Sequence, residues 1–372
     1  MKKVAIFINS LRGGGAERIV SYLLQEGCDK FEFHLVLLQK DIEYEIPGSD
    51  KVRVFELEGN GSSKFSSIFR MKSLSRKFRN YLEENRIDTV LSLLNRPNLI
   101  ACRAKKSGWK GKLIISERAD TLAYYKTVRF GWYMIKLVRK YYPHADAVTV
   151  ISKGIARSLA KLGINNAQVI YNPIYITSVE RPATNGRPFT FINVARLEPQ
   201  KNHALLLKAF SRLSNKNTRL IILGKGVLLN SLEKLSAELG INGRVSFEGF
   251  QKDIRSYLYN SDCFVFSSDY EGLGNVIIEA LQAGLPVIST DCPYGPREIL
   301  SPESDTDTLI KNDIDISAYG ILTPVGNDEC LTLAMQKIID DTELRDKYKE
   351  LAIPRSLDFD IKEISKKYFD LF

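Results

Sequence analysis

YEGLGNVIIEALQAGLPVIST, residues 270–290, is the run from which the fold class can be predicted. It begins with a polar loop that carries glycines, and from Asn275 the apolar residues recur at the spacing of one buried helix face. Pro286 ends that helix, and the apolar residues after it are typical of a short buried strand. The order of loop, helix and strand predicts a parallel α/β sheet.

The start of this helix favours a ligand that combines phosphate with hydroxyl groups. Gly274 leaves backbone N–H groups uncovered at the positive end of the helix, which suits an anion. Glu271 and Glu279 bracket that end, and because carboxylates repel phosphate they are better suited to accept hydrogen bonds from hydroxyls. A nucleotide sugar offers both groups. The alternative is that both glutamates are ordinary acids near a helix start, where the dipole favours them.

Length and composition indicate a globular chain of two domains. The chain has 372 residues, of which 44% are hydrophobic and 26% charged. No run approaches the roughly 18 apolar residues of a membrane-spanning helix, and Val4–Ile8 is too short an apolar run for a signal peptide. The five cysteines are scattered without C-x-x-C spacing, which favours a reducing compartment and argues against disulfides and a zinc site.

Positive charge is concentrated in the first half of the chain. Residues 1–180 hold 30 Lys and Arg against 17 Asp and Glu, whereas residues 181–372 hold 23 against 27. Residues 59–82 and 121–145 contain no acid, and their basic side chains alternate with aromatic and aliphatic ones, as in helices that lie on anionic membranes. The residues expected to face a membrane are Lys64, Arg70, Lys72, Arg76, Lys77, Arg129, Trp132 and Lys136.

Two other interpretations of these basic segments are possible. They can be surface helices that pack on a sheet and leave their charges in water. They can also bind nucleic acid through phosphate contacts and base stacking. No nucleic-acid-binding motif accompanies them, so we expect no nucleic acid as a partner.

Residues that follow predicted strands are further candidates in the first half. We choose them because the carboxyl ends of parallel strands line the cleft of such folds. Gly14 and Gly15 lie between a strand at 2–9 and a helix, where glycines let backbone amides approach an anion closely. A tight structural turn is the alternative. Asn95 and Arg118 follow strands at 87–94 and 112–116.

The second half contains a pair of cations in the same kind of position. Arg196 and Lys201 follow a strand at 189–194 and precede a helix. The planar fork of an arginine and the point charge of a lysine suit a diphosphate, and they would stabilise a leaving group as its charge develops. The alternative, two surface cations at a helix start, is disfavoured by the helix dipole.

Several motifs resemble one family across nearly the whole chain. The run E-G-x-x-N-x-x-x-E-A-x-x-x-G-x-P-V-I from Glu271 resembles the paired-glutamate signature of retaining GT-B glycosyltransferases of family 4. The run R-L-x-x-x-K-N from Arg196 is similar to the diphosphate clamp of that family, and G-G-A-E-R from Gly14 is similar to its first loop. The run C-P-x-G-P-R-E-I-L from Cys292 is similar to a segment of some bacterial members.

The resemblance implies roles for individual residues. It implies that Arg196, Lys201 and Glu271 act in catalysis, Glu271 by holding sugar hydroxyls. The donor would also contact Gly224, Phe250, Gly274, Asn275, Val276 and Glu279, with the ribose on Glu279 and the base near Phe250. Gly14 and Gly15 would face the donor diphosphate or the acceptor. Many relatives have a histidine where this chain has Arg118, and because a guanidinium stays protonated, Arg118 is expected to bind a phosphate or acceptor oxygen instead of acting as a base. Asn95 is a second candidate for acceptor or phosphate binding.

We therefore predict an α/β protein of the GT-B fold, with two Rossmann-like domains whose parallel sheets face each other across a cleft. Residues 1–175 would form a basic, membrane-facing acceptor domain, residues 176–188 a linker and residues 189–355 the nucleotide-sugar domain. Residues 356–372 would form a terminal helix that crosses back to the first domain.

The predicted activity is transfer of a hexose or N-acetylhexosamine from a nucleotide-diphosphate sugar, UDP-linked, with retained configuration. The acceptor would be a membrane-associated glycan or a polyprenyl-diphosphate-linked sugar at the cytoplasmic face. No metal or other cofactor is expected, because the cationic clamp supplies the positive charge. A nucleotide-sugar 2-epimerase of the same fold and a non-catalytic binder of anionic polymers are the alternatives.

Overall fold

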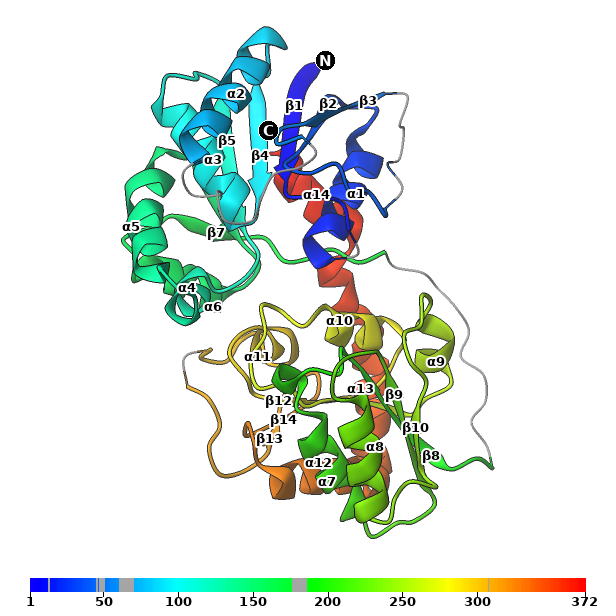
Figure 1. Ribbon diagram of the computed structural model, residues 1–372. Helices are drawn as coiled ribbons and strands as arrows, with labels where there is room; N and C mark the ends of the chain where they lie inside the picture. The colour runs from blue at the N-terminus through cyan, green and yellow to red at the C-terminus, as the bar shows by residue number, and fades with distance from the viewer. Residues whose placement is uncertain (13, 45, 47–50, 60–69, 176–185, 307) are drawn as a thin grey trace. The chain divides into compact units, whose positions relative to one another are not determined.

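The chain folds into two compact units (Figure 1). The computed structural model describes all residues except 13, 45, 47–50, 60–69, 176–185 and 307. Unit 1 comprises Met1–Pro173 together with Ile361–Phe372, and unit 2 comprises Ile174–Asp360. The predicted membrane-facing residue Lys64 and most of the predicted linker lie outside the described residues.

Unit 1 is built on a parallel sheet with the order β3-β2-β1-β4-β5-β6-β7. Its strands are β1 (Lys2–Ile8), β2 (Phe31–Leu37), β3 (Val52–Glu56), β4 (Thr89–Leu93), β5 (Lys112–Glu117), β6 (Ala147–Val150) and β7 (Ala167–Val169). The order reverses beside β1, as in a doubly wound nucleotide-binding fold. The central strands are buried on both faces, which explains their nearly continuous apolar sequences.

Helices pack on this sheet with their apolar stripes turned inward. They are α1 (Gly15–Gly27), α2 (Met71–Glu84), α3 (Asn95–Lys106), α4 (Thr121–Thr127), α5 (Gly131–Tyr141), α6 (Lys153–Ala160) and α14 (Ile361–Phe369). In α2, the basic helix predicted within 59–82, the buried residues include Met71, Leu74 and Phe78, four or fewer positions apart. Its Lys and Arg residues are left on the outer face.

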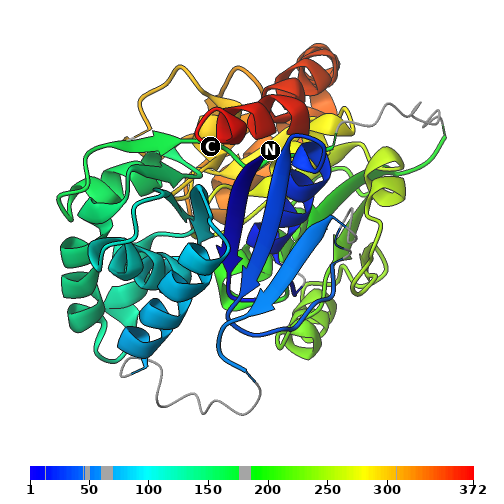
Figure 2. The ribbon, with the colours of Figure 1, turned by 90° about the horizontal axis from the view of Figure 1, so that it is seen from above.

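The last helix returns the chain to the sheet on which it began. In α14, Ile364 and Tyr368 are buried in the core of unit 1. Figure 2 shows the two chain ends close together, and the Lys2 ammonium donates a hydrogen bond to the carbonyl of Phe372. The ring of Phe372 lies 5.3 Å from that of Phe31 on β2, measured between centroids.

Unit 2 repeats this topology with the order β10-β9-β8-β11-β12-β14-β13. Its strands are β8 (Phe189–Val194), β9 (Thr218–Leu223), β10 (Val245–Phe247), β11 (Cys263–Phe266), β12 (Val287–Thr290), β13 (Asp315–Ile316) and β14 (Ile321–Thr323). All neighbours are parallel except β13 and β14. The prediction of an α/β fold with two parallel sheets is therefore confirmed, whereas the short antiparallel edge strand β13 was not predicted.

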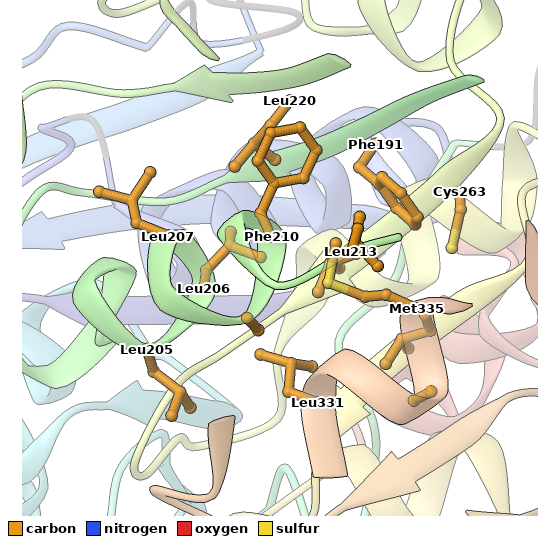
Figure 3. Packing of buried hydrophobic residues seen from close by; sticks show 14 of the residues in the cluster. Phe191, Leu205, Leu206, Leu207, Phe210, Leu213, Leu220, Cys263, Leu331 and Met335 are labelled. Carbon is orange, nitrogen blue, oxygen red and sulfur yellow. The ribbon is translucent and has the colours of Figure 1, made fainter. Parts of the chain in front are cut away.

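The core of unit 2 forms between the sheet and helices on its face. The helices are α7 (His203–Ser211), α8 (Leu229–Glu238), α9 (Arg255–Tyr259), α10 (Asn275–Gln282), α11 (Pro296–Leu300), α12 (Asp328–Asp340) and α13 (Thr342–Ser356). Figure 3 shows Leu206 and Phe210 of α7 pointing toward strand residues such as Phe191 and toward Met335 of α12. Because α7 begins at His203, two residues after Lys201, this core also fixes the loop that carries the predicted clamp.

Within the described part of the chain, no helix is both long and apolar enough to cross a membrane. All five cysteines are free thiols, and Cys102, Cys263, Cys292 and Cys330 are buried. Burial raises the pKa of the Cys263 thiol well above its usual value.

Replacing Leu206 by alanine tests the core on which the second unit depends. Leu206 is fully buried, so Leu206→Ala should lower the free energy of unfolding of unit 2 by about 2–5 kcal/mol. Thermal and urea unfolding measured by circular dichroism would check this. Leu333→Ala on the exposed side of α12, where the side chain is 52% exposed, is the control and should change stability by less than about 0.5 kcal/mol.

Candidate functional site

The predicted residues Lys201 and Glu271 come together in unit 2. Lys201 lies in the loop after β8 and Glu271 in the loop after β11, and these two strands are parallel neighbours. Their loops therefore leave the same edge of the sheet. The Lys201 ammonium donates a hydrogen bond to Glu271 Oε1, and the two side chains are only 15% and 11% exposed. A largely buried, oriented cation is thus fixed at this edge.

Hydrogen bonds between the two loops hold this ion pair in place. Gln200 Nε2 donates to the carbonyl of Tyr270 over 2.6 Å, and Asn202 Nδ2 donates to Asp269 Oδ1 over 2.8 Å. The backbone N–H of Asp269 donates to the carbonyl of Gln200 over 2.9 Å. Sequence reasoning missed Gln200, Asn202 and Asp269, because a bond across nearly 70 residues leaves no local pattern.

Gly274 directly precedes α10, at the predicted helix start, and has a left-handed backbone with φ +86°, which glycine adopts without strain. Asn275 and Val276 are the first residues of the helix and are half-buried, and Glu279 is half-buried one turn further on. Behind this loop, the backbone N–H of Glu271 donates to the carbonyl of Pro293 over 2.7 Å. The N–H groups of the first turn and the carboxylate of Glu271 are therefore positioned by a rigid backbone.

Arg196 differs from Lys201 in its surroundings. Its side chain is 68% exposed, and it pairs with Glu198 two residues later at 2.9 Å. Both cations lie on the loop after β8, so the predicted pair belongs to one segment. In the structure Lys201 is a fixed cation and Arg196 is an exposed one on the same loop.

Two further predicted donor residues follow the neighbouring strands. Gly224 directly follows β9 and has φ +142°, and a side chain there would overlap the carbonyl of Ala195 on the loop after β8. Its N–H donates to the carbonyl of Gly249 over 2.7 Å, which brings the loop after β10 to the same edge. Phe250 on that loop is 67% exposed, with the Lys225 ammonium 5.3 Å from its ring centroid. An exposed ring at a sheet edge can stack on a base.

Gly14 and Gly15 lie in unit 1, at the start of α1. The carboxylate of Glu17 folds back toward Gly14 and occupies the space that a side chain on that glycine would need. Burial raises the pKa of Glu17, while a bond to its own backbone N–H and the charge of Arg118 oppose the rise. The start of α1 is thus covered by an acid of its own helix.

Arg118 is buried in unit 1 and joins three distant segments. Its guanidinium donates to Tyr368 of α14 over 3.0 Å, to Ser116 of β5 over 3.4 Å and to the side-chain oxygen of Asn172. This is an observed structural role, and phosphate binding by Arg118 stays a prediction. Its partner Tyr368 lies 250 positions away in sequence, so no local motif could have revealed the contact.

Asn95 lines a pocket of about 380 Å³ at the carboxyl edge of the unit 1 sheet. Its neighbours in the lining include Met71, Arg96, Tyr124, Tyr125 and Met134. Thr121 links Asn95 to Glu117, which is fully buried and accepts hydrogen bonds from Asn98, Thr121 and Tyr142. Burial raises the pKa of Glu117, and these hydrogen bonds oppose the rise. Sequence analysis missed Glu117 and Tyr124.

The described residues predicted to face a membrane lie on two parts of unit 1. Arg70, Lys72, Arg76 and Lys77 are on or beside α2, where Lys77 donates to the carbonyl of Leu57 over 2.6 Å. Arg129, Trp132 and Lys136 lie at the turn between α4 and α5 and on α5. The turn residues are exposed, Trp132 by 61%.

Comparison with known families finds a match for each half of the chain. The model of group 1 glycosyl transferases matches residues 177–354, and that of glycosyltransferase family 4 matches residues 13–177. The two matches divide the chain between the two units. The chain therefore belongs to the family 4 glycosyltransferases, and its predicted identification as a member of that family is confirmed.

Individual relatives agree with this assignment. The chain is 32% identical, over 98% of both chains, to an N-acetylgalactosamine-N,N'-diacetylbacillosaminyl-diphospho-undecaprenol 4-alpha-N-acetylgalactosaminyltransferase of Campylobacter jejuni. It is 26% identical, over 100% of its own length and 98% of the other, to an alpha-1,4-N-acetyl-D-galactosaminyltransferase of the same organism. Its fold resembles that of Anabaena HepE, solved with UDP and glucose, with a TM-score of 0.77, 20% identity and coverage of 100% and 99%. The GT-B fold class is thereby confirmed.

His203 provides a pH test of the segment that carries the clamp. Burial, together with the nearby Lys201 charge, lowers the pKa of this first residue of α7 to about 4. Between about pH 6.5, the ordinary pKa of a histidine, and about pH 4, His203 is protonated in the unfolded chain and neutral in the folded chain. The free energy of unfolding therefore falls as the pH drops from about 6.5 toward about 4. His203→Leu should remove about 2–3 kcal/mol of this acid sensitivity.

The measurement is urea unfolding of wild type and variant at several pH values in this range. His144→Leu in unit 1 is the control for a histidine substitution. Equal acid sensitivity of wild type and His203→Leu would show that His203 is not the group responsible.

Proposed function

We propose that this protein transfers a hexose or N-acetylhexosamine from a UDP-linked sugar to a lipid-linked or other membrane-associated glycan, with retention of configuration. The observation that carries the proposal is the fixed Lys201–Glu271 pair, with Arg196 on the same loop and the start of α10 beside it. The Campylobacter relatives, whose names specify diphospho-undecaprenol acceptors, support the acceptor class.

The chemistry of transfer assigns a task to each group. Breaking the sugar–phosphate bond leaves an additional negative charge on the departing diphosphate, and preorganised cations stabilise that charge most effectively. Lys201 would supply a cation already in position, and Arg196 would turn from Glu198 to the phosphates. The N–H groups of Asn275 and Val276 would donate to the diphosphate at the start of α10. No metal is required in this scheme, since these groups supply the positive charge.

The two glutamates would orient the sugar and the nucleoside. Glu271 accepts a hydrogen bond from Lys201 through one oxygen, and its carboxylate retains further lone pairs for hydroxyls of the transferred sugar. Glu279 would accept hydrogen bonds from the ribose, one turn further along α10. Phe250 would stack against the base.

The turn between α4 and α5 is the feature that supports contact with an anionic membrane. Gly131 packs so closely on α4 that a side chain there would overlap the carbonyl of Tyr125, and Phe130 before it has φ +63°. The turn therefore projects Phe130 and Trp132, which are 53% and 61% exposed. The guanidinium of Arg129 and the ammonium of Lys136 lie 5.1 and 4.9 Å from the centroids of these rings.

Aromatic rings with cations beside them suit the interface between lipid headgroups and acyl chains. The acid-free stretch 121–145 adds no charge that an anionic surface would repel. We infer peripheral binding to the inner face of the membrane from the cytoplasm. This placement would bring unit 1 to a lipid-linked acceptor while the UDP-sugar arrives from solution.

Replacing Arg196 by alanine tests the clamp. UDP-sugars should raise the melting temperature of the wild-type protein, since a ligand that binds only the native state stabilises it. Arg196→Ala should lower the rate of sugar transfer by about 10²-fold or more. It should lower the rate of donor hydrolysis, a slower background reaction that also releases UDP, by a similar factor. The exposed position of Arg196 predicts no loss of fold.

Arg255→Ala is the matched control, because Arg255 forms a similar exposed pair, with Asp253 at 2.9 Å, elsewhere in unit 2. It should leave transfer unchanged. Near-normal turnover of Arg196→Ala would contradict the clamp assignment, and the absence of a thermal shift with every UDP-sugar would contradict the proposed donor.

Vesicle binding tests the membrane proposal. Each basic residue near an anionic surface contributes about 1 kcal/mol, so Arg129→Gln with Lys136→Gln should weaken binding to phosphatidylglycerol vesicles by about 30-fold. Trp132→Ala should weaken it further. Sedimentation with anionic and with neutral vesicles measures the effect, and Lys252→Gln with Lys347→Gln, two exposed lysines of unit 2, is the control. Unchanged binding of the first variant would contradict the role of this turn.

A further inference from the structure

We propose that the pocket in unit 1 binds a 2-acetamido sugar of the acceptor, and that Thr121 and Glu117 set the orientation of the Asn95 amide that recognises it. The identification of this sugar with the acceptor rests on the proposed function, whereas the binding site itself does not. At about 380 Å³ the pocket falls within the range of small-molecule sites.

The electrostatics of the pocket favour a neutral ligand over a phosphate. Arg96 is a cation in the lining, but its guanidinium forms two hydrogen bonds with the carboxylate of Glu58, whose side chain is 2% exposed. The charge of Arg96 is therefore compensated before any ligand arrives. Asn95 is uncharged, and the other lining groups include the rings of Tyr124 and Tyr125 and the thioethers of Met71 and Met134.

A chain of hydrogen bonds determines which end of the Asn95 amide is available. Thr121 Oγ1 donates its single proton to Glu117 Oε2 over 2.7 Å, because a buried carboxylate receives donors. Thr121 Oγ1 must then accept from Asn95 over 2.9 Å, which requires the amide nitrogen Nδ2 at this contact. The amide oxygen Oδ1 is the end left for a ligand in the pocket.

Other hydrogen bonds fix Glu117, so the series of hydrogen bonds from Glu117 through Thr121 to Asn95 is rigid. Its Oε1 accepts from Asn98 Nδ2 over 3.1 Å and from the hydroxyl of Tyr142. Both Glu117 and Thr121 are buried. Leu94, directly before Asn95, has φ +76°, a strained backbone that directs the start of α3 into this position. Such strain in a residue other than glycine is concentrated at functional sites.

The class of ligand follows from these groups. An acetamido group offers one N–H donor for Asn95 Oδ1 and a methyl group for the apolar lining. The pyranose ring carries C–H groups that pack on an aromatic face, and Tyr124 presents such a face at 54% exposure. A hexose with a hydroxyl in place of the acetamido group lacks the methyl. The pocket should therefore discriminate between the two.

The test uses methyl glycosides as probes of the full-length protein. Saturation-transfer NMR should show contact of the acetyl methyl in the methyl α-glycosides of N-acetylglucosamine or N-acetylgalactosamine, with affinity at least about tenfold above that of the corresponding methyl hexosides. Equal affinity for both kinds of sugar, or no binding of either acetamido sugar in the millimolar range, would overturn the proposal.

Variants of Thr121 test the positioning role. Thr121→Val removes the link between Glu117 and Asn95 and should weaken acetamido-sugar binding about three- to tenfold, with little change for UDP. Thr121→Ser keeps the hydroxyl and should restore binding. Thr127→Val on the same helix is the control, because Thr127 is exposed and its hydroxyl bonds only the local carbonyl of Tyr124 in the described structure.

Further outcomes separate this inference from the proposed function. If Thr121→Val does not fold, Asn95→Ala tests the same contact, and full acetamido-sugar binding by either variant would overturn the assignment. UDP binding is measured on the same samples. Acetamido-sugar binding without UDP binding would contradict the proposed function and support the assignment of the pocket. UDP binding without acetamido-sugar binding would contradict only the assignment of the pocket.

Discussion

In each unit the first strand pairs in parallel with the fourth, and the rest of the structure depends on this pairing. In each unit the strand order reverses beside the first strand, so the loops after two neighbouring strands leave the sheet at one edge. In unit 2 this brings Lys201 after β8 beside Glu271 after β11. In unit 1 the neighbouring strands are β1 and β4, and Asn95 follows β4. The same backbone geometry thus produces two sites of different character.

The two sites differ in the ion-pair partners of their cations. Lys201 is largely buried and forms an ion pair with Glu271, whereas Arg196 on the same loop remains exposed. In the proposed function, incoming phosphates would meet a cation that is already oriented and would recruit a second one from solvent. In unit 1, Arg96 is neutralised by a buried carboxylate, so an arginine in a pocket lining does not by itself indicate an anion site. The partner of each cation determines what it can bind.

The sequence was sufficient to predict the fold class and to identify the sheet edge at which most of the unit 2 candidates lie, because both depend on local patterns. Alternation of buried strands with helices predicts the sheets, and glycines at helix starts or cations after strands mark the edge where Gly274 and Lys201 lie. The network of Glu117, Thr121 and Asn95 depends instead on the side-chain packing of α3 and α4 above β5. Its members have no diagnostic spacing, so only the folded structure identifies them.

Arg118 shows most clearly why a motif position does not establish a role. Its place after β5 predicts a side chain at the ligand-binding edge, and a guanidinium there suits phosphate. The folded chain directs that guanidinium to Asn172 and to Tyr368 of α14, a helix that joins unit 1 only at the end of the sequence. An arginine that is buried by such partners cannot leave them without exposing unsatisfied hydrogen-bonding groups. The observed role of Arg118 is therefore to join β5, Asn172 and α14, while its binding of a phosphate or acceptor oxygen stays a prediction.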